Sequence, residues 1–293
     1  MLSTLKKIGV RCAVYKVISR LFPQDDLVLS YCDRIGAYRY LSKYKYVLDR
    51  MQADYSKTQG VGDIVWLCWL QGYDNAPDLV KRCRESVVRH NPGKKIVIID
   101  NENVEEYIDI PEYIKRKHSR GIIPFAHYSD YIRVSLLAKY GGTWIDSTMF
   151  LTGPVPQYID CLPLFFFRSE FVGKVYGANN FIAACPDNPI ILQTKELLNE
   201  YWLHENKLVS YSIFHLFWTM VLEYNEQNRR CLDKVPFVPS LDTYLLQKVM
   251  FDTYSDDRFG QIKSITPIHK LTYRFSEEEA SRKDTFYQYL LRQ

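Results

Sequence analysis

The chain has 293 residues, 47% of them hydrophobic, and its 38 Lys and Arg against 34 Asp and Glu give a net charge of +4. This is enough chain for one sizeable core, or for one core and an appendage. The seven Cys are odd in number and form no C-x-x-C pair, which excludes a disulfide framework and zinc-ligand spacing and favours a reducing compartment. No apolar run reaches the ~18–20 residues of a membrane-spanning helix.

The amino-terminal end is basic. Residues 1–50 hold ten Lys and Arg and four Asp, a net charge of +6, which leaves −2 for the rest of the chain. Residues 1–22 are expected to form a helix that stops at Pro23, and they lack the cleavage site of a signal peptide. Such a segment predicts an anionic partner, either a membrane surface or a nucleic acid. A charged helix face that packs on the protein and faces water explains the pattern equally well.

A different pattern begins after Gly60 and Gly62, where short apolar runs alternate with helical periodicity. Strands are expected at 64–70, 94–100 and 143–151, and helices at 77–90, after Pro111 and at 126–139. Further along, strands are expected at 165–167 and 180–184, and helices at 189–203, 210–228, 241–251 and 274–292. This order predicts an α/β fold with a mostly parallel sheet flanked by helices. We expect a basic helical segment over 1–58 and an α/β domain over 59–293.

Polar residues mark the carboxyl ends of the three expected parallel strands. They are Gln71, Asp100 and Asp146. Ligands of open parallel sheets bind beyond these strand ends. The sequence therefore predicts a binding site at this edge of the sheet.

The densest polar stretch is 126–150. Asp130 and Arg133 lie three residues apart on one helix face, and Gly141-Gly142 allow a tight turn into the next strand, from which Asp146 emerges beside the carboxyl edge of the sheet. Carboxylates with a nearby Arg suit a ribose, a diphosphate and its divalent metal. The spacing alone is also explained by an ion pair within the helix and a structural Asp at the sheet edge.

These residues, taken in order, resemble the capsular polysaccharide synthesis protein family and the sugar-donor region of retaining glycosyltransferases, including the glycosylating toxins. The resemblance covers roughly residues 62–273 and implies a glycosyltransferase-A fold. Its pieces are IVWLCWLQG (64–72), the Pro77-to-Ser86 helix, ID-N (99–101), the SD-R-GG-W-D run, NFIAACPDNP (180–189) and PIHKLTY (267–273).

The resemblance also implies roles for individual residues. Asp130, Arg133 and Asp146 are the expected catalytic residues. Among the expected donor-binding residues, Trp66 would stack on the base and Lys270 would contact the diphosphate. The others are Gln71, Asp100, Asp130, Arg133, Trp144 and Asn180. The expected ligands of a divalent metal, Mn²⁺ or Mg²⁺, are Asp146, Thr148 and His269.

One position departs from the family pattern. Thr148 stands where the second acid of the D-x-D metal motif is expected, and a hydroxyl is a poorer ligand for a hard cation than a carboxylate. Three alternatives follow: the metal is held weakly, it is held through the diphosphate and His269, or it is replaced by Lys270.

The resemblance implies transfer of a sugar from a nucleotide-diphosphate sugar, such as a UDP-sugar, to a saccharide or lipid-linked saccharide, with retention of anomeric configuration. We expect a cytoplasmic protein, peripheral on the inner membrane face through residues 1–22, and no nucleic-acid partner. A non-catalytic nucleotide-sugar-binding or scaffold protein remains the alternative that Thr148 favours. A nucleic-acid-binding protein would explain the basic amino-terminal end but not the Gly-Gly-Thr-Trp-Ile-Asp run.

Overall fold

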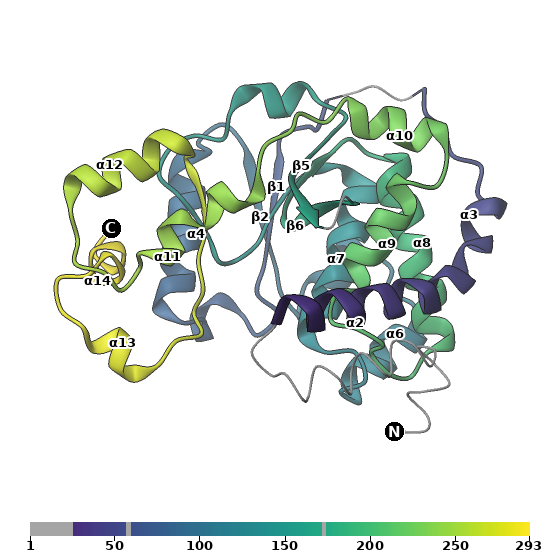
Figure 1. Cartoon of the computed structure of the whole chain (residues 1–293), viewed down its shortest axis with the longest axis horizontal. Coiled ribbons are helices and arrows are strands. Elements are labelled where there is room, and N and C mark those ends of the chain that lie inside the picture. The colour runs from purple at the N-terminus through teal and green to yellow at the C-terminus, as the bar shows by residue number, and fades with distance from the viewer. Residues whose placement is uncertain (1–25, 57–59, 172–173) are drawn as a thin grey trace. The chain divides into compact units, whose positions relative to one another are not determined.

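The computed structural model describes residues 26–56, 60–171 and 174–293 (Figure 1). The helix expected over 1–22 lies outside the described residues. The described chain forms two compact units. We call the first the helical unit; it holds the described residues up to Tyr55, Ile110–Val134 and Pro189–Asp233. The second, the sheet unit, holds Ser56–Asp109, Ser135–Asn188 and Lys234–Gln293.

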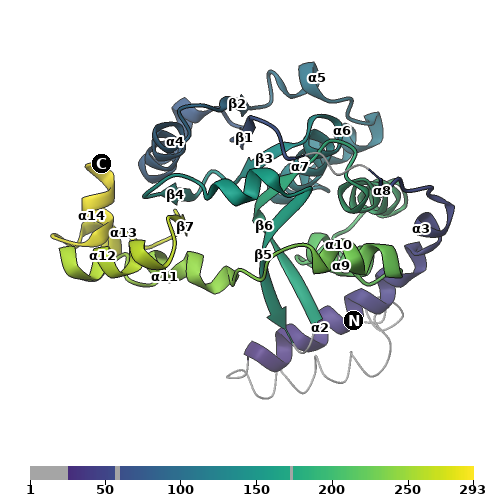
Figure 2. The ribbon, with the colours of Figure 1, turned by 90° about the horizontal axis from the view of Figure 1, so that it is seen from above.

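The sheet unit is built on five strands in the order β2-β1-β3-β6-β5 (Figure 2). Their bounds are β1 Ile64–Cys68, β2 Lys95–Ile99, β3 Gly142–Ile145, β5 Leu164–Phe171 and β6 Lys174–Ala184. The ladders of β1 with β2 and with β3 are parallel, and β6 runs antiparallel to both β3 and β5. Among these strands β6 alone therefore runs against the rest, and the predicted α/β class with a mostly parallel sheet is confirmed.

Buried β-branched and aromatic side chains explain why these strands form the core. Val65 and Leu67 of β1 pack in one cluster with Phe165 and Phe181 of the β5–β6 pair. The helix α4 Asp78–His90 follows β1, and its Val87 joins the same cluster. The remaining short elements that bracket these strands are η2 Tyr73–Asn75, α5 Val104–Tyr107 and η3 Gln157–Cys161.

A smaller two-stranded sheet pairs β4 Met149–Leu151 with β7 Ile268–Lys270 (Figure 2). Phe150 of β4 belongs to a second buried cluster, together with side chains of the carboxyl-terminal helices. Those helical elements are η4 Ser240–Tyr244, α11 Leu245–Lys248, α12 Asp256–Ile265, α13 Glu277–Ser281 and α14 Phe286–Leu291. This unit therefore uses the end of the chain to hold the strand that follows β3.

Several expected elements are shorter in the structure than the periodicity predicted. The strand expected over 143–151 is broken into β3 and β4 by a turn. The helix expected over 210–228 is two helices, α9 Ile213–Leu222 and α10 Glu226–Asp233, and the one over 274–292 is α13 and α14. Apolar periodicity locates the ends of elements only approximately, so it did not reveal these short turns.

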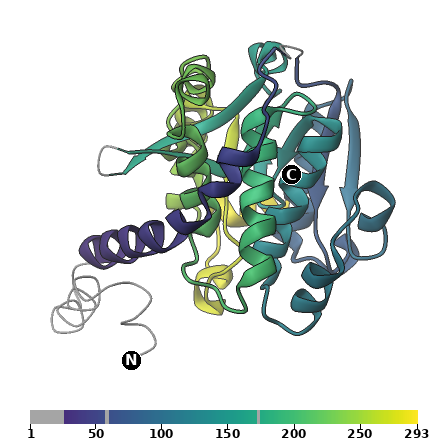
Figure 3. The same ribbon diagram turned by 90° about the vertical axis from the view of Figure 1, so that its right-hand side faces the viewer.

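The helical unit contains α2 Asp26–Leu41, η1 Ser42–Tyr44, α3 Tyr46–Arg50, α6 Glu112–Ser119, α8 Pro189–His204, α9 and α10. The helix α7 Phe125–Tyr140 begins in this unit and ends in the sheet unit. Figure 3 shows α8 and α9 side by side, and aromatic rings of Tyr44, Tyr201 and Phe217 meet edge to face in the core of the unit. Among the described residues, no helix combines the length and the apolar character needed to cross a bilayer.

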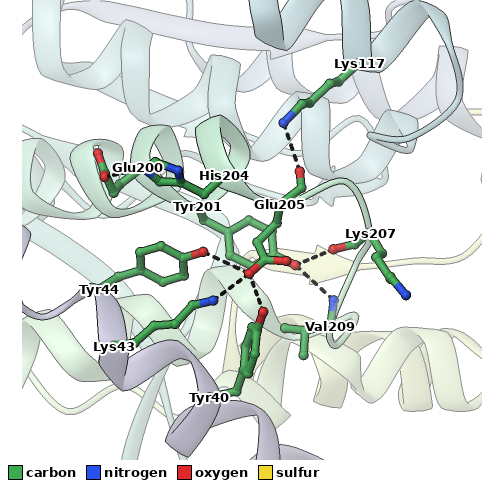
Figure 4. Close-up of polar contacts among 10 residues, drawn as sticks. All are labelled: Tyr40, Lys43, Tyr44, Lys117, Glu200, Tyr201, His204, Glu205, Lys207 and Val209. Carbon is green, nitrogen blue, oxygen red and sulfur yellow. Dashed lines mark hydrogen bonds and ion pairs between the residues drawn. The ribbon is translucent and has the colours of Figure 1, made fainter. Parts of the chain in front are cut away.

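Glu205 joins three parts of the helical unit (Figure 4). Its carboxylate accepts hydrogen bonds from the hydroxyls of Tyr40 and Tyr44 and from the ammonium of Lys43, the last at 2.7 Å. Its backbone carbonyl accepts a bond from the Lys117 ammonium at 3.0 Å, at the carboxyl end of α8. Lys117 thus binds the negative end of the helix dipole while Glu205 holds the end of α2 and η1.

Candidate active site

The turn between β3 and β4 carries Asp146 and Thr148. The backbone N–H of Met149 donates to the Asp146 carbonyl at 2.8 Å and closes the turn. The backbone N–H of Asp146 donates in turn to the Asn180 carbonyl of β6 at 2.8 Å. The turn is therefore fixed to the neighbouring strand, at the carboxyl end of β3, where the sequence predicted a site.

Gly141 and Gly142 allow β3 to enter the sheet. Both have left-handed backbone angles, with φ of 65° and 97°. A Cβ at Gly142 would lie 2.5 Å from the Ile64 carbonyl oxygen and 2.9 Å from Trp66 Nε1, and one at Gly141 would lie 2.8 Å from the Ala184 carbonyl oxygen. Residues with a Cβ fit neither the angles nor the space. The Gly-Gly pair is thus required to place Asp146 four residues later.

Lys270 meets both polar residues of the turn. Its ammonium lies 3.1 Å from Asp146 Oδ2 and 2.5 Å from Thr148 Oγ1. The other carboxylate oxygen, Asp146 Oδ1, accepts a 2.9 Å bond from Trp144 Nε1. The side chains of Asp146 and Lys270 keep 22% and 19% of their surface exposed. A partly exposed cation and anion are therefore held together at the carboxyl end of β3.

Asn180 and Tyr244 complete the surroundings of Asp146. Asn180 is buried, and its Oδ1 has no partner among the described residues. Burial and the negative charge of Asp146 raise the pKa of the Tyr244 hydroxyl, although its hydrogen bond with Asn180 opposes the rise. Sequence reasoning missed Tyr244, because it lies in a short 3₁₀ helix that belongs to no motif quoted above.

His269 faces away from this group. It precedes Lys270 on β7, and successive side chains of a strand point to opposite faces. The imidazole is fully buried, its Nε2 lies 2.9 Å from Thr152 Oγ1, and burial lowers its pKa to about 4, so it is neutral at pH 7. Asp146, Thr148 and His269, the three predicted metal ligands, therefore do not converge. Among the described residues, no cluster of three or more His, Cys, Asp or Glu could hold a metal.

Trp66 lies inside the sheet unit rather than at its edge. The side chain is 1% exposed, and its Nε1 donates to the Gly141 carbonyl at 2.8 Å. Its ring packs against Tyr107 and Tyr140, with centroids 5.7 and 5.6 Å away. In this arrangement Trp66 supports the Gly-Gly turn and offers no free face to a base.

Trp69 is the indole that directly follows β1. It is half-buried, and its ring meets that of Tyr273 edge to face at 5.5 Å. Its Nε1 has no hydrogen-bond partner among the described residues. The base-stacking role that the resemblance gave to Trp66 therefore has a better-placed candidate in Trp69.

The other two predicted strand-end residues differ in their surroundings. Gln71 is exposed. Asp100 caps its own turn, because its Oδ1 accepts the backbone N–H groups of Glu102 at 2.9 Å and Asn103 at 3.1 Å. The acid at the end of β2 thus has a local structural explanation, and donor binding by either residue stays a prediction.

Asp130 and Arg133 lie in the helical unit and form a buried ion pair, 6% and 4% exposed. Burial alone would raise the pKa of Asp130, but the Arg133 charge and the neighbouring His127, whose Nδ1 lies 3.5 Å from Asp130 Oδ2, outweigh it and hold the pKa below its usual value. The Arg133 guanidinium also lies over the Phe214 ring, 5.6 Å from its centroid. The sequence predicted this pair on one helix face; its binding of donor stays a prediction.

Comparison with known proteins adds relatives along most of the chain. A 156-residue stretch is 31% identical to the O-glycosyltransferase braB of Annulohypoxylon truncatum; it covers 47% of this chain and 37% of that protein. A 176-residue stretch is 22% identical to the uncharacterized glycosyltransferase L373 of Acanthamoeba polyphaga mimivirus, covering 57% of this chain and 67% of that one. The chain therefore spans little more than a third of the first of these relatives.

Two solved structures resemble the fold loosely. PaToxG glycosyltransferase matches with a TM-score of 0.38 and 14% identity over 91% of this chain and 97% of its own. The glycosyltransferase GlyE of Streptococcus pneumoniae TIGR4 matches with a TM-score of 0.35 and 15% identity over 80% and 63%. Likeness at this level supports no conclusion about activity.

The match to a family model is more extensive. The model described as capsular polysaccharide synthesis protein matches residues 36–290, which include the β3–β4 turn, Lys270 and the Asp130–Arg133 pair. This range also holds every predicted site residue. The chain belongs to the capsular polysaccharide synthesis protein family.

Proposed function

We propose that the chain is a glycosyltransferase that moves a sugar from a nucleotide-diphosphate sugar to a saccharide or lipid-linked saccharide. Family membership and two relatives named as glycosyltransferases support this proposal. The observation that carries it is the Lys270 ammonium, held by Asp146 and Thr148 beside the carboxyl end of β3. A fixed, partly exposed cation at this edge suits a diphosphate.

The chemistry requires such a cation. When the anomeric carbon leaves the donor, negative charge develops on the departing nucleoside diphosphate. A cation placed beforehand stabilises that charge without reorganising as the reaction proceeds. Lys270 would supply the positive charge, and Asp146 would hold the ammonium in place. We expect the donor to be a UDP-sugar. We also expect the transferred sugar to keep its anomeric configuration.

The remaining predicted residues would hold the other parts of the donor. Trp69 would contact the base, because its half-buried ring follows β1, and the unpaired Asn180 Oδ1 would accept a hydrogen bond from the sugar. Asp130 and Arg133 would bind a ribose or donor sugar. Each of these roles belongs to the proposal and needs its own variant.

Membrane association is a separate part of the proposal. Residues 1–22 lie outside the described residues, and their basic and apolar side chains support binding to an anionic surface. A peripheral enzyme on the cytoplasmic face would meet a lipid-linked acceptor at high local concentration. Sedimentation of the full chain with anionic vesicles at low salt would support this, and its absence would contradict it.

The activity is tested with a panel of nucleotide sugars. The full chain is incubated with UDP-, GDP-, ADP-, CDP- and TDP-sugars, and release of nucleoside diphosphate is measured with and without added saccharide acceptors. We expect one donor to be hydrolysed slowly and an effective acceptor to increase its turnover. A donor that raises the melting temperature but is never turned over would favour the non-catalytic binding protein instead, because ligand binding alone stabilises the folded state. Binding of no donor at all would contradict both functions.

A further inference from the structure

We propose that the Lys270 ammonium takes the place of the divalent cation at the β3–β4 turn, so that sugar transfer does not depend on a metal. The proposal rests on the proposed function, because it concerns the same diphosphate. It differs from the metal-dependent site that the resemblance implied. The argument begins with the groups that this turn offers to a cation.

These groups fit a hard divalent cation poorly. Mg²⁺ and Mn²⁺ prefer several oxygen ligands, carboxylates above all. The turn contributes one carboxylate and one hydroxyl, from Asp146 and Thr148. Both Asp146 oxygens already accept bonds, from Trp144 Nε1 at 2.9 Å and Lys270 Nζ at 3.1 Å. The third expected ligand, His269, points to the opposite face of β7 and lies against Thr152.

Lys270 fits the same position well. An ammonium has three donors and no acceptor, and two of its donors here meet Asp146 and Thr148. These two hydrogen bonds fix the direction of the third N–H group, which can donate to a phosphate oxygen. A hydroxyl suits this arrangement better than a second carboxylate, because two acids would neutralise the charge that the diphosphate needs. The contact with Lys270 therefore explains why Thr148 stands where the family pattern has a second acid.

The transfer step then balances without a metal. The bond between the anomeric carbon and the diphosphate oxygen breaks, and its electron pair stays on the diphosphate. The acceptor hydroxyl oxygen forms the new bond to the anomeric carbon, and its proton ends on the released nucleoside diphosphate. Lys270 keeps its proton throughout and stabilises the departing charge by hydrogen bonding.

The first test measures binding of nucleoside diphosphates to the full chain by calorimetry. UDP, GDP, ADP, CDP and TDP are each titrated with EDTA and with Mn²⁺. We expect the best ligand to bind with affinities within about threefold of each other in the two conditions. An affinity at least about tenfold higher with Mn²⁺ would overturn the proposal and leave the proposed function standing. Binding of no nucleoside diphosphate in either condition would contradict the proposed function as well.

The second test compares lysine variants in EDTA. We expect Lys270→Ala to weaken nucleoside diphosphate binding by about 10- to 100-fold, the range for a hydrogen bond to a charged group, and to change nucleoside binding little. Lys270→Arg should recover part of the loss, because it restores a cation. Lys283→Ala removes an exposed lysine of the same unit and should behave as the unmodified chain. Equal affinity in Lys270→Ala and the unmodified chain would overturn the proposal.

The third test introduces the second carboxylate that a metal site at this turn would need. The double variant Lys270→Ala/Thr148→Asp removes the ammonium and supplies the second acid. We expect Mn²⁺ to increase the nucleoside diphosphate affinity of this variant by about tenfold or more, and to leave that of the unmodified chain unchanged. A melting curve establishes that the double variant is folded. Equal responses to Mn²⁺ in the two proteins would contradict the inference.

Discussion

The Lys270 ammonium lies 3.1 Å from Asp146 Oδ2, although 124 residues separate the two along the chain. The contact exists because β7 pairs with β4, which places Lys270 opposite Met149, just after the turn that begins at Asp146. The carboxyl-terminal part of the sheet unit therefore completes the site at the end of β3. Any change that displaces β7 should weaken diphosphate binding without touching Asp146 itself.

The first prediction concerns Asp146→Asn. The substitution keeps the size of the side chain but removes the charge that holds Lys270, so we expect transfer to fall by about 100-fold with the fold retained. Turnover of the identified donor and a melting curve measure the two effects. Asp257→Asn, an exposed acid on α12, is the control and should be neutral. Near-normal turnover in Asp146→Asn would remove Asp146 from the site.

The second prediction concerns the Gly-Gly turn. Gly142→Ala should destabilise the protein by about 2 kcal/mol or more, since it adds left-handed backbone strain to a clash with the Ile64 carbonyl. Gly62→Ala adds strain alone, because no atom lies within 4 Å of its new Cβ, and should cost about 1–2 kcal/mol. Gly260→Ala, inside α12 with open space, should stabilise by about 0.5–1 kcal/mol. Denaturant unfolding of the three variants gives the order; equal effects would mean that the close approach at Gly142 is unimportant.

Sequence patterns were sufficient to predict the sheet and one half of the site. Short apolar runs identified β1, β2 and β3, and the Gly-Gly-Thr-Trp-Ile-Asp run placed Asp146 at a strand end. These features depend on neighbours in sequence and on the period of strands and helices, both of which a single sequence displays. The same patterns placed Asp130 and Arg133 on one face of α7, where they pair.

Burial and strand pairing could not be predicted in the same way. A buried run does not reveal which of two tryptophans faces the interior, and Trp66 lies inside while Trp69 lies at the edge. The polar residues Asp146, Ser147 and Thr148 form a turn inside the strand expected over 143–151, and the sequence analysis predicted neither β4 nor its pairing with β7. That pairing turns His269 away from Asp146 and brings Lys270 to it. The alternation of side chains along β7 determines that Lys270, and not His269, meets Asp146. This can be predicted only when the strand that pairs with β7 is known.

The third prediction concerns Glu205, which holds α2 and η1 to the end of α8. Burial alone would raise the pKa of this carboxyl, but the bonds from Lys43, Tyr40 and Tyr44 outweigh it and lower the pKa. A lowered pKa in the folded state stabilises the protein above the unfolded value of about 4.3, and this stabilisation is lost as the pH falls through the folded value. Glu205→Gln should therefore destabilise at pH 7, and the difference should shrink below pH ~4.

Melting curves across this pH range measure the effect of Glu205. The control is Glu277→Gln, an exposed acid at the start of α13, whose melting temperature should follow that of the unmodified chain at every pH. A constant difference between Glu205→Gln and the unmodified chain from pH 7 down to the acid transition would show that shape, rather than charge, makes Glu205 important.

The last prediction separates the two buried indoles of the neighbouring strands β1 and β3. Trp66 pairs in register with Trp144, and each donates one hydrogen bond through Nε1, to the Gly141 carbonyl and to the Asp146 carboxylate respectively. Replacing either with Phe removes the N–H and keeps most of the apolar ring. Trp66→Phe should lose about 1–3 kcal/mol of stability, because it leaves the buried Gly141 carbonyl without its donor. Trp144→Phe should lose less, because the Asp146 carboxylate is partly exposed and can bond to water instead.

Their effects on the reaction should differ. Trp144→Phe removes the 2.9 Å bond to Asp146 Oδ1, so the carboxylate is held less firmly against Lys270, and we expect turnover to fall by about tenfold or more with little change in binding of the nucleoside. Trp66→Phe should leave both quantities near normal, because its bond goes to the Gly141 carbonyl and touches neither Asp146 nor Lys270. Turnover and nucleoside affinity are measured well below the melting temperature of both variants. A loss of nucleoside affinity in Trp66→Phe would restore Trp66 to the base site and contradict its assignment to the core.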